Sequence, residues 1–369
     1  MANPGLSDTD CEEALRLVDL HGSITAAADA AGISRTTMQS RVTTARARKS
    51  GMIVTGRSTL TNLQTGEPVM EWVKESLDRQ KAAEAQQAAY GALCEKLPRA
   101  APVPPPNICD DHLCNLYTYS DFHLGMLAQE EEGGANWDLK IAERTLTDSF
   151  ALMVAQSPAA STAVLNIQGD MLHTDGLLPV TPAHRHILDA DGRFGRIVEV
   201  AIRSIRRLVA LALEKHRTVH LVVCEGNHDE ASSVWLRLMF QALYELEPRV
   251  TVNASELPFY VFQFGANMLG FHHGHKVKNE QLPLLFAAQF PDVWGKTTRR
   301  AIHCGHRHHC DEKEYNGVTV VQHPTIAARD AYAARGGWIA DRAVQSITYH
   351  SEWGQVGRVW ITPEMLRAA

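Results

Sequence analysis

The stretch "VHLVVCEGNHDE", residues 219–230, decides the fold of this chain. Its first half is an apolar run rich in valine, which is typical of a strand buried inside a sheet. The run ends at Gly226, where the backbone can turn sharply, and the polar residues Asn227, His228 and Asp229 follow. In open α/β sheets, ligands bind at the carboxyl ends of the strands. The stretch therefore predicts an α/β sheet with a site at this edge.

Four further stretches have the same form, an apolar run followed by polar residues. They are "NLYTYSDFHLG" (115–125), "AVLNIQGDMLH" (163–173), "NMLGFHHGH" (267–275) and "RAIHCGHRHH" (300–309). In the first, Asp121 and His123 are two positions apart, so both side chains point to the same side as the strand ends. Because the carboxyl ends of the strands converge on one crevice, we expect one cluster of aspartate, asparagine and histidine side chains.

In chain order the polar ends are D-x-H, G-D, G-N-H-D, H and G-H-x-H, which resembles the motifs of the calcineurin-like metallophosphoesterase superfamily. The resemblance covers about residues 112–325 and implies an α/β fold, a four-layer αββα sandwich around a two-metal site. It implies two sets of metal ligands, namely Asp121, His123, Asp170 and His308 for one ion, and Asp170, Asn227, His273 and His306 for the other. Asp170 then bridges the ions. Either His272 or His275 could replace His273 as a ligand.

The residue types fit such a centre. Two divalent ions outweigh the two ligand carboxylates, Asp121 and Asp170, so the loaded site stays positive and can bind a phosphate oxygen. Mixed nitrogen and oxygen ligands without thiolate favour Mn²⁺, with Fe²⁺ and Zn²⁺ as alternatives. The neighbouring Cys304, Cys310 and His309 are expected to stay outside the site.

Two details indicate the reaction. "SDFHLG" (120–125) resembles the first motif of SbcD-type DNA-repair nucleases, and the resemblance places His173 near the substrate phosphate and His228 as the general acid or charge stabiliser. Protein phosphatases of the superfamily carry G-D-x-x-D-R-G, whereas this chain has "GDMLHTDG" without the arginine. A diester is therefore favoured, and we expect a DNA nuclease. "QHPT" (322–325) departs from the related N-P-G-S loop, so no substrate contact is inherited there.

Two alternatives stay open. One is a phosphatase or cyclic-nucleotide phosphodiesterase that acts on small phosphoesters. The other is a non-catalytic DNA-binding regulator, against which the complete ligand set argues. Residues 181–196 form an insertion between the second and third motifs, and a set of basic and histidine side chains there could cap a substrate or merely be solvated. The set consists of His184, Arg185, His186 and Arg193.

The N-terminal part is alanine-rich and has a helical pattern. Ser23 can cap a helix over residues 24–31, Gly32 ends it, and Ser34 can cap a third helix that runs to about Arg48. A small residue at Ala28, then glycine, then an aliphatic residue resembles the spacing of a helix-turn-helix. A helix-turn-helix joined to a phosphoesterase is similar to proteins of phages and prophages.

Between Ala30 and Gly66 the chain has no Asp or Glu. The cations in this segment are Arg35, Arg41, Arg46, Arg48, Lys49 and Arg57. Local positive charge on a chain with a net charge of -6 is what docking onto DNA phosphates requires, and we expect the first five to contact DNA. The alternative is a three-helix bundle whose basic face is solvated.

The segment "LPRAAPVPPPN" (97–107) is rich in proline and predicts an extended linker. Residues 67–97 are expected to form a long helix, a spacer or a dimerising element. The sequence thus predicts a small all-α helix-turn-helix domain over residues 1–66, a helical spacer and linker over 67–107, and a metallophosphoesterase domain over 108–369.

The composition of the whole chain bears on its disulfides, on membrane spans and on its location in the cell. The 7 cysteines are an odd number, which argues against a disulfide framework, and 18 histidines are unusually many. No apolar run reaches the length of a membrane span, and the first residues lack the apolar core of a signal peptide. We therefore expect a cytoplasmic protein with DNA and no membrane as its partner. A homo-oligomer is possible, and the need for a partner ATPase of the SbcC type stays open.

Overall fold

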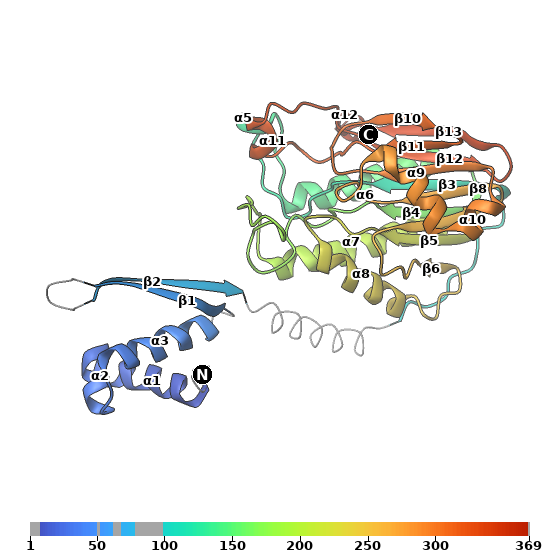
Figure 1. Ribbon diagram of the computed structural model, residues 1–369. Coiled ribbons are helices and arrows are strands. Elements are labelled where there is room, and N and C mark those ends of the chain that lie inside the picture. The colour runs from blue at the N-terminus through green and yellow to red at the C-terminus, as the bar shows by residue number, and fades with distance from the viewer. Residues whose placement is uncertain (1–7, 50–51, 62–67, 78–98, 368–369) are drawn as a thin grey trace. The chain divides into compact units, whose positions relative to one another are not determined.

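A computed structural model describes residues 8–49, 52–61, 68–77 and 99–367 (Figure 1). The chain divides into two compact units, Met1–Lys96 and Leu97–Ala369. Each unit is described by itself. Within the described ranges, the helices are too short or too polar to cross a membrane.

The first unit begins with three helices: α1 (Asp8–His21), α2 (Ile24–Ala30) and α3 (Arg35–Lys49). Both expected caps are present, since Ser23 Oγ accepts a hydrogen bond from Ala26 N at 3.1 Å and Ser34 Oγ accepts one from Thr37 N at 3.0 Å. The three helices share a small buried core that consists of Ala14, Ala27, Ala28, Met38 and Val42. The predicted helices and their capping residues are confirmed.

A β-hairpin follows these helices, which corrects two predictions. β1 (Met52–Thr61) pairs antiparallel with β2 (Pro68–Leu77), so residues 1–66 are not all-α and the helix predicted from residue 67 is wrong over Pro68–Leu77. The predicted boundary at 66/67 falls between the two paired strands. The stretches "MIVTGRSTLT" and "PVMEWVKESL" carry β-branched and aromatic residues, which favour strands over a helix. The remainder of the predicted helix, residues 78–97, lies outside the described residues.

The second unit contains two sheets. The first has the order β13-β12-β3-β4-β5-β6. Its strands are β3 (Asp110–Tyr119), β4 (Ala160–Ile167), β5 (Thr218–Val223), β6 (Val250–Val252), β12 (Val344–His350) and β13 (Gly354–Ile361). β3 to β6 run parallel, while β12 is antiparallel to both β3 and β13. All carboxyl ends of the four parallel strands therefore lie at one edge.

The second sheet has the order β10-β11-β9-β8-β7. Its strands are β7 (Tyr260–Phe264), β8 (Asn267–Phe271), β9 (Arg299–Cys304), β10 (Asp311–Tyr315) and β11 (Val318–Gln322). β8, β9 and β11 are parallel, and the outer strands β7 and β10 are antiparallel to their neighbours.

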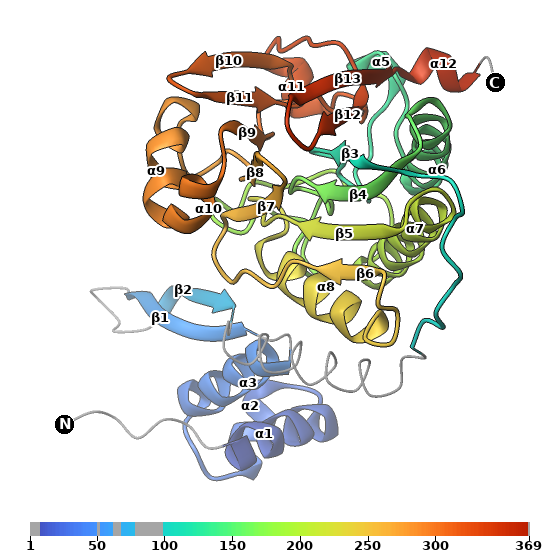
Figure 2. The ribbon, with the colours of Figure 1, turned by 90° about the vertical axis from the view of Figure 1, so that its right-hand side faces the viewer.

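The two sheets pack face to face, with helices on the outer faces (Figure 2). Leu116 and Val164 of the first sheet meet Leu269 and Phe271 of the second in a buried apolar core. α6 (Leu139–Gln156), α7 (Phe194–Lys215) and α8 (Glu230–Leu243) cover the first sheet, and α9 (Leu282–Gln289) and α10 (Pro291–Lys296) cover the second. Short helices complete the unit: α5 (Glu130–Gly133), η1 (Asn279–Gln281), α11 (Ala331–Arg335) and α12 (Pro363–Arg367). The predicted four-layer αββα sandwich is confirmed.

The proline-rich segment runs as an extended chain along this unit. Proline has no N–H to donate, and the other residues of the segment bond to both backbone and side chains, as in Ala100 N to Leu243 O at 2.8 Å. Arg249 donates to the carbonyls of Val103 at 2.9 Å and Pro104 at 3.1 Å, and Glu247 accepts from Val103 N at 2.8 Å. The segment is extended as expected, and side chains of the second unit anchor it.

Candidate metal centre

The polar residues that follow the strands gather at one edge of the sandwich. Each lies just beyond the last residue of β3, β4, β5, β8 or β9. We call this set the polar cluster: Asp121, His123, Asp170, Asn227, His228, His273, His306 and His308. The loop after β3 is held against the loop after β4 by backbone hydrogen bonds from Asp121 N to Gly169 O at 3.2 Å and from His123 N to Asp170 O at 2.9 Å. Sheet topology thus positions the side chains before any metal binds.

One half of the cluster is centred on His308. Its Nε2 lies 3.3 Å from Asp121 Oδ1 and 3.4 Å from His123 Nε2. The ligand atoms of these three residues are all within 4.8 Å of one another. A carboxylate and two imidazoles that point to a common position are a suitable donor set for a divalent transition metal.

The other half is centred on His273. Its Nε2 lies 3.2 Å from Asp170 Oδ2, 3.2 Å from Asn227 Oδ1 and 3.7 Å from Asp121 Oδ1. The ligand atoms of Asp121, Asp170, His273 and His306 form a second group within 4.8 Å. The two groups share Asp121, whereas the resemblance assigns the bridge to Asp170. The bridging role of Asp170 therefore stays a prediction.

The backbone of the cluster is strained. Among the described residues, six other than glycine have a positive φ, and five of them are predicted metal ligands. Their φ values are 52° for Asp121, 49° for His123, 52° for Asp170, 73° for His306 and 59° for His308. Each such residue costs about 1–2 kcal/mol, so the surrounding structure must hold it there. Because the strain falls on the predicted ligands, the fold holds these side chains in a set geometry at a cost in local stability.

Two glycines make the cluster compact. A Cβ on Gly226 would lie 2.1 Å from Asp170 Oδ1, and one on Gly169, where φ is +93°, would lie 2.6 Å from His273 Nδ1. No side chain fits at either place. The glycines of the G-N-H-D and G-D motifs are thus explained by close approach to two predicted ligands.

Electrostatics tie the histidines to the carboxylates. Burial raises the pKa of Asp170, but the charges of His273, His228 and His123 together outweigh this effect, and the pKa lies well below its ordinary value. Burial lowers the pKa of His273, and the charges of Asp170 and Asp121 outweigh burial and raise that pKa to about 10. Without metal, protons therefore supply the positive charge that the buried carboxylates require. Metal ions binding to the same atoms would displace these protons.

His228 and His173 lie beside the first half of the cluster. His228 Nδ1 donates to the carbonyl of His173 at 2.9 Å, and the ring centroid of His228 is 4.7 Å from that of His123. His173 is 2% exposed, and its Nδ1 lies 3.3 Å from Nδ1 of His123. Burial, followed by the charge of His228, lowers the pKa of His173 to about 3. The structure brings His173 against the cluster, and its contact with substrate stays a prediction.

Asp229 supports the cluster in a way that the sequence interpretation missed. Its buried carboxylate accepts hydrogen bonds from the backbone N of Asp170 at 3.2 Å, Met171 at 2.7 Å, Leu172 at 3.1 Å and Gly226 at 3.0 Å. It therefore fastens the loop after β4 to the loop after β5. In the sequence, the position of Asp229 as the last residue of G-N-H-D was the feature that could have indicated this role.

Two further residues orient ligands. His273 Nδ1 donates to the carbonyl of Gln168 at 2.8 Å, which directs its Nε2 to the cluster. Thr325 Oγ1 donates to the carbonyl of Asp121 at 2.7 Å. Thr325 belongs to "QHPT", the loop that departs from the related N-P-G-S loop and to which the resemblance therefore carries over no substrate contact. Its contact is with the backbone of a predicted ligand.

Neither alternative to His273 is in the two groups of ligand atoms described above, although the ring centroid of His275 is only 5.3 Å from that of His273. His272 is buried and its Nδ1 donates to the carbonyl of Pro258 at 2.8 Å. His275 lies in a separate group with Glu225 and Glu230, and Lys276 forms an ion pair with Glu225 there. The bystanders stay outside as expected: Cys304 is buried in the core of the second sheet, and Cys310 and His309 are exposed.

The side chains predicted to bind DNA are placed in part. Arg35 is exposed at the start of α3. Arg41 is half-buried and lies 3.2 Å from Asp10 Oδ1 in an ion pair. Arg46, Arg48 and Lys49 lie on α3, with side chains outside the described residues, as is the side chain of Arg57 on β1. In the second unit, His184, Arg185, His186 and Arg193 of the insertion are exposed.

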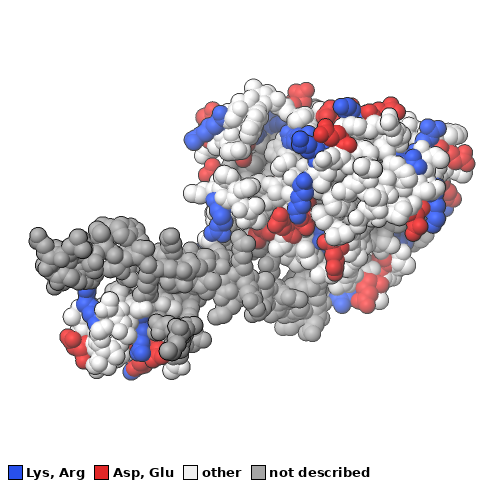
Figure 3. Space-filling view, in the orientation of Figure 1, with Lys and Arg blue, Asp and Glu red and all other residues white. Residues whose placement is uncertain are grey.

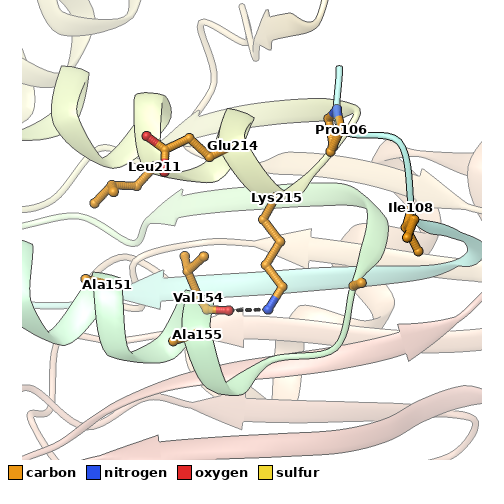
Figure 4. Close-up of a pocket in the computed structure, with 9 residues that line it drawn as sticks. Pro106, Ile108, Ala151, Val154, Ala155, Leu211, Glu214 and Lys215 are labelled. Atoms are coloured by element: carbon orange, nitrogen blue, oxygen red, sulfur yellow. Dashed lines mark hydrogen bonds between the residues drawn. The ribbon is translucent and has the colours of Figure 1, made fainter. Parts of the chain in front are cut away.

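A pocket at the opposite edge of the sandwich is not lined by a cluster of aspartate and histidine side chains (Figure 4). It lies between the carboxyl ends of α6 and α7, beside the amino ends of β3 and β4, and is lined by Val154, Ile108 and Lys215 among others. The ammonium group of Lys215 donates to the carbonyls of Val154 and Ser157, so its hydrogen bonds are used within the fold. The candidate site is therefore at the carboxyl edge.

No family model and no curated protein matches the chain. Among solved structures it is similar to Yfce, a phosphoesterase from E. coli, at 17% identity and a TM-score of 0.33 over 66% of this chain and 98% of that one. It is also similar to a predicted phosphoesterase from Streptococcus pneumoniae, at 11% identity and a TM-score of 0.30 over 68% and 91% of the two chains. A third is a 5′-nucleotidase from Candida albicans, at 13% identity and a TM-score of 0.33 over 71% and 53%. Likenesses of this strength do not establish an activity.

Proposed function

We propose that the second unit is a metal-dependent phosphodiesterase of the calcineurin-like metallophosphoesterase type, and that its substrate is DNA. The observation that carries the proposal is the polar cluster itself. Residues from five separate strand ends direct carboxylate, amide and imidazole atoms to two adjoining positions. Gathering buried carboxylates and imidazoles on strained backbone is costly, which a role in binding explains and a purely structural role does not.

The donor set fits two divalent cations, with Mn²⁺ expected and Fe²⁺ or Zn²⁺ as alternatives. When bound, such ions activate water and neutralise charge on a phosphoryl group. The chain itself contributes a placed imidazole. Because His228 Nδ1 donates to the carbonyl of His173, its Nε2 is the nitrogen that remains to face the leaving oxygen, and a ring protonated on both nitrogens would donate from there. His228 N also donates to Asp170 Oδ1 at 2.8 Å, which fixes the residue to the cluster.

A diester suits the site better than a monoester. The loop "GDMLHTDG" that follows β4 contains no Lys or Arg, so it offers no guanidinium to grip the extra charge of a monoester dianion. The eight residues of the polar cluster are two carboxylates, an amide and five histidines. This supports the diesterase over the phosphatase alternative.

Turnover of bis-p-nitrophenyl phosphate, p-nitrophenyl phosphate and single- and double-stranded DNA tests the proposal. The chain is first freed of metal and then supplied with Mn²⁺. His228→Ala should lower diester turnover about hundredfold while the bound metal stays unchanged. Turnover of the small diester without any DNA cleavage would favour the small-substrate alternative. A metal-loaded protein that hydrolyses neither would favour the non-catalytic regulator.

The first unit is proposed to bind DNA for the second. Arg35 supports this because its side chain is exposed at the start of α3, whereas Arg41 is already paired with Asp10. Arg35→Ala should weaken DNA binding by the full chain and reduce its dependence on salt, with Arg16→Ala on α1 as the exposed control. Equal effects of both substitutions would indicate a general loss of charge rather than a docking face.

A further inference from the structure

Two loops of the second unit border the polar cluster. The first contains the insertion 181–196, and the backbone of its Asp189 lies close enough to the His173 ring to act on the pKa of that ring. The same loop pairs with the loop after β3, through Leu127 N to Asp189 O at 2.9 Å. The second loop follows β11, includes α11, and passes close enough for the charge of Asp330 to act on His308. Both loops therefore lie next to the proposed reaction site.

Aromatic rings connect these loops. The ring centroids of His184 and His186 are 5.8 Å apart, those of His186 and Tyr332 are 6.4 Å apart, and those of Tyr332 and Trp338 are 5.3 Å apart. We call these four residues the aromatic ladder. It begins in the insertion and ends beyond α11, so it crosses from one bordering loop to the other.

The ladder is exposed where a stabilising cluster would be buried. Tyr332 is 67% exposed and Trp338 is 58% exposed. Aliphatic neighbours in the two loops are more exposed still, with Ile187 at 87% and Ile339 at 84%. Large aromatic side chains contribute to stability by leaving water, and these have not done so. Contiguous exposed apolar surface beside a polar site is typical of a binding surface.

Two arginines accompany the ladder. Arg185 lies between His184 and His186 in the sequence, and Arg335 ends α11; both side chains are exposed. Acidic residues lie nearby as well, since Asp330 caps α11 and α11 contacts α5, which carries glutamates. On the face shown in Figure 3, Lys and Arg of the second unit are interspersed with Asp and Glu. That face has no continuous basic track of the kind that follows a duplex backbone. Rings with a few arginines suit a ligand that has both flat apolar groups and phosphates.

We propose that the aromatic ladder stacks the unpaired bases of a single-stranded nucleic acid whose neighbouring phosphate lies at the polar cluster. This inference rests on the proposed diesterase function and names its substrate class. In a duplex the base faces are covered by neighbouring pairs, so only an unpaired strand offers them to the rings. Stacking accepts any base, and the ladder therefore confers preference for strand type rather than sequence.

Binding of the full-length chain to fluorescent oligothymidylate, without divalent metal, tests the ladder apart from catalysis. A fully abasic strand of equal length is the matched probe, because it keeps the phosphates and lacks the bases. Tyr332→Ala and Trp338→Ala should each weaken binding to oligothymidylate about tenfold and leave binding to the abasic strand unchanged. Tyr332→Phe and Trp338→Phe keep a ring and should restore binding. Trp353→Ala is the control, since Trp353 is 65% exposed but stacks on His350, away from the two loops.

Catalysis supplies the second readout. With Mn²⁺, the two alanine variants should raise KM for oligothymidylate and leave turnover of bis-p-nitrophenyl phosphate unchanged. Unaltered binding of oligothymidylate, or equal losses with the abasic strand, would overturn the ladder. Loss of self-association with normal binding would assign the surface to a second copy of the chain instead. A wild-type chain that hydrolyses no diester but still prefers oligothymidylate to the abasic strand would refute the proposed function and not the ladder.

Discussion

The second unit contains two sets of paired histidines that differ in one respect. In the polar cluster, His123 and His308 direct Nε2 atoms at each other across 3.4 Å, beside buried carboxylates. Between the sheets, His303 Nδ1 lies 2.9 Å from His323 Nε2, and the remaining nitrogens bond to Tyr349 at 3.1 Å and Gln345 at 2.8 Å. We call His303 and His323 the inner pair.

The difference lies in hydrogen-bond balance. If Gln345 donates to His323, then His323 donates to His303 and His303 donates to Tyr349, so each ring needs a single proton and stays neutral. Burial lowers the pKa of His303 to about 3, in agreement with a neutral ring. In the cluster, by contrast, Nε2 of His308 is directed at two neighbours at once, Asp121 and His123, and five predicted ligands have a positive φ. Burial of histidine alone does not indicate a metal site; several ligand atoms that converge on one position do.

The largest expected effect comes from breaking the cluster. His123→Gln removes an imidazole ligand, so diester turnover with Mn²⁺ should fall about thousandfold and one ion should be lost. Stability of the metal-free protein should change little, because burial and the charge of His228 already hold the pKa of His123 low and the ring makes no ion pair there. Metal analysis and denaturant unfolding measure the two effects. Full activity with both ions bound would remove His123 from the ligand set.

The inner pair should respond in the opposite sense. His303→Leu leaves His323 and Tyr349 with unpaired polar atoms in the core, which should cost about 3 kcal/mol of unfolding free energy. Bound metal and turnover of the small diester should remain close to those of the wild type. The urea midpoint of the second unit, with metal content as control, checks this. A variant that loses metal but not stability would mean that the two sets are not separate.

Stability in acid tests another buried histidine, His216, whose two ring nitrogens both have partners, as in the inner pair. Its Nδ1 donates to the carbonyl of Ala160 at 2.7 Å and its Nε2 accepts from Tyr117 at 2.9 Å. Burial lowers its pKa from 6.5 to about 4. The unfolded chain therefore binds a proton that the folded one does not, so this contribution is complete above pH 6.5 and declines as pH falls toward 4.

The expected loss between pH 7 and pH 5 is about 2 kcal/mol. Unfolding of the metal-free second unit by urea at both pH values measures it, and His216→Gln should reduce the difference. An equal pH difference in that variant would assign the acid sensitivity to other groups.

The sequence predicted the sandwich and the cluster because both depend on short stretches. An apolar run that ends in glycine and a ligand specifies strand, turn and edge together, as in residues 219–230. The hairpin of β1 and β2 was missed, since alternation in "PVMEWVKESL" is short and follows a helical region. The inner pair could not be predicted, because His303 and His323 meet only when β9 and β11 pair. The partners of Asp229 were missed for the same reason, as they lie in two loops.

Asp229 offers the smallest and most specific change. Asn has the same shape but presents an NH₂ group where a carboxylate oxygen accepts from Met171 and Leu172. Burial, then the charge of Asp170, raises the pKa of Asp229 above its ordinary value. The substitution disturbs the hydrogen bonds that hold the loop after β4 to the loop after β5, both of which carry predicted metal ligands. Mn²⁺ affinity should fall about tenfold, with turnover recovered at saturating metal, because oriented partners of metal ligands contribute about that much. Titration with Mn²⁺ followed by activity measures this, and unchanged affinity would show that the strained ligand loops hold their geometry without the carboxylate.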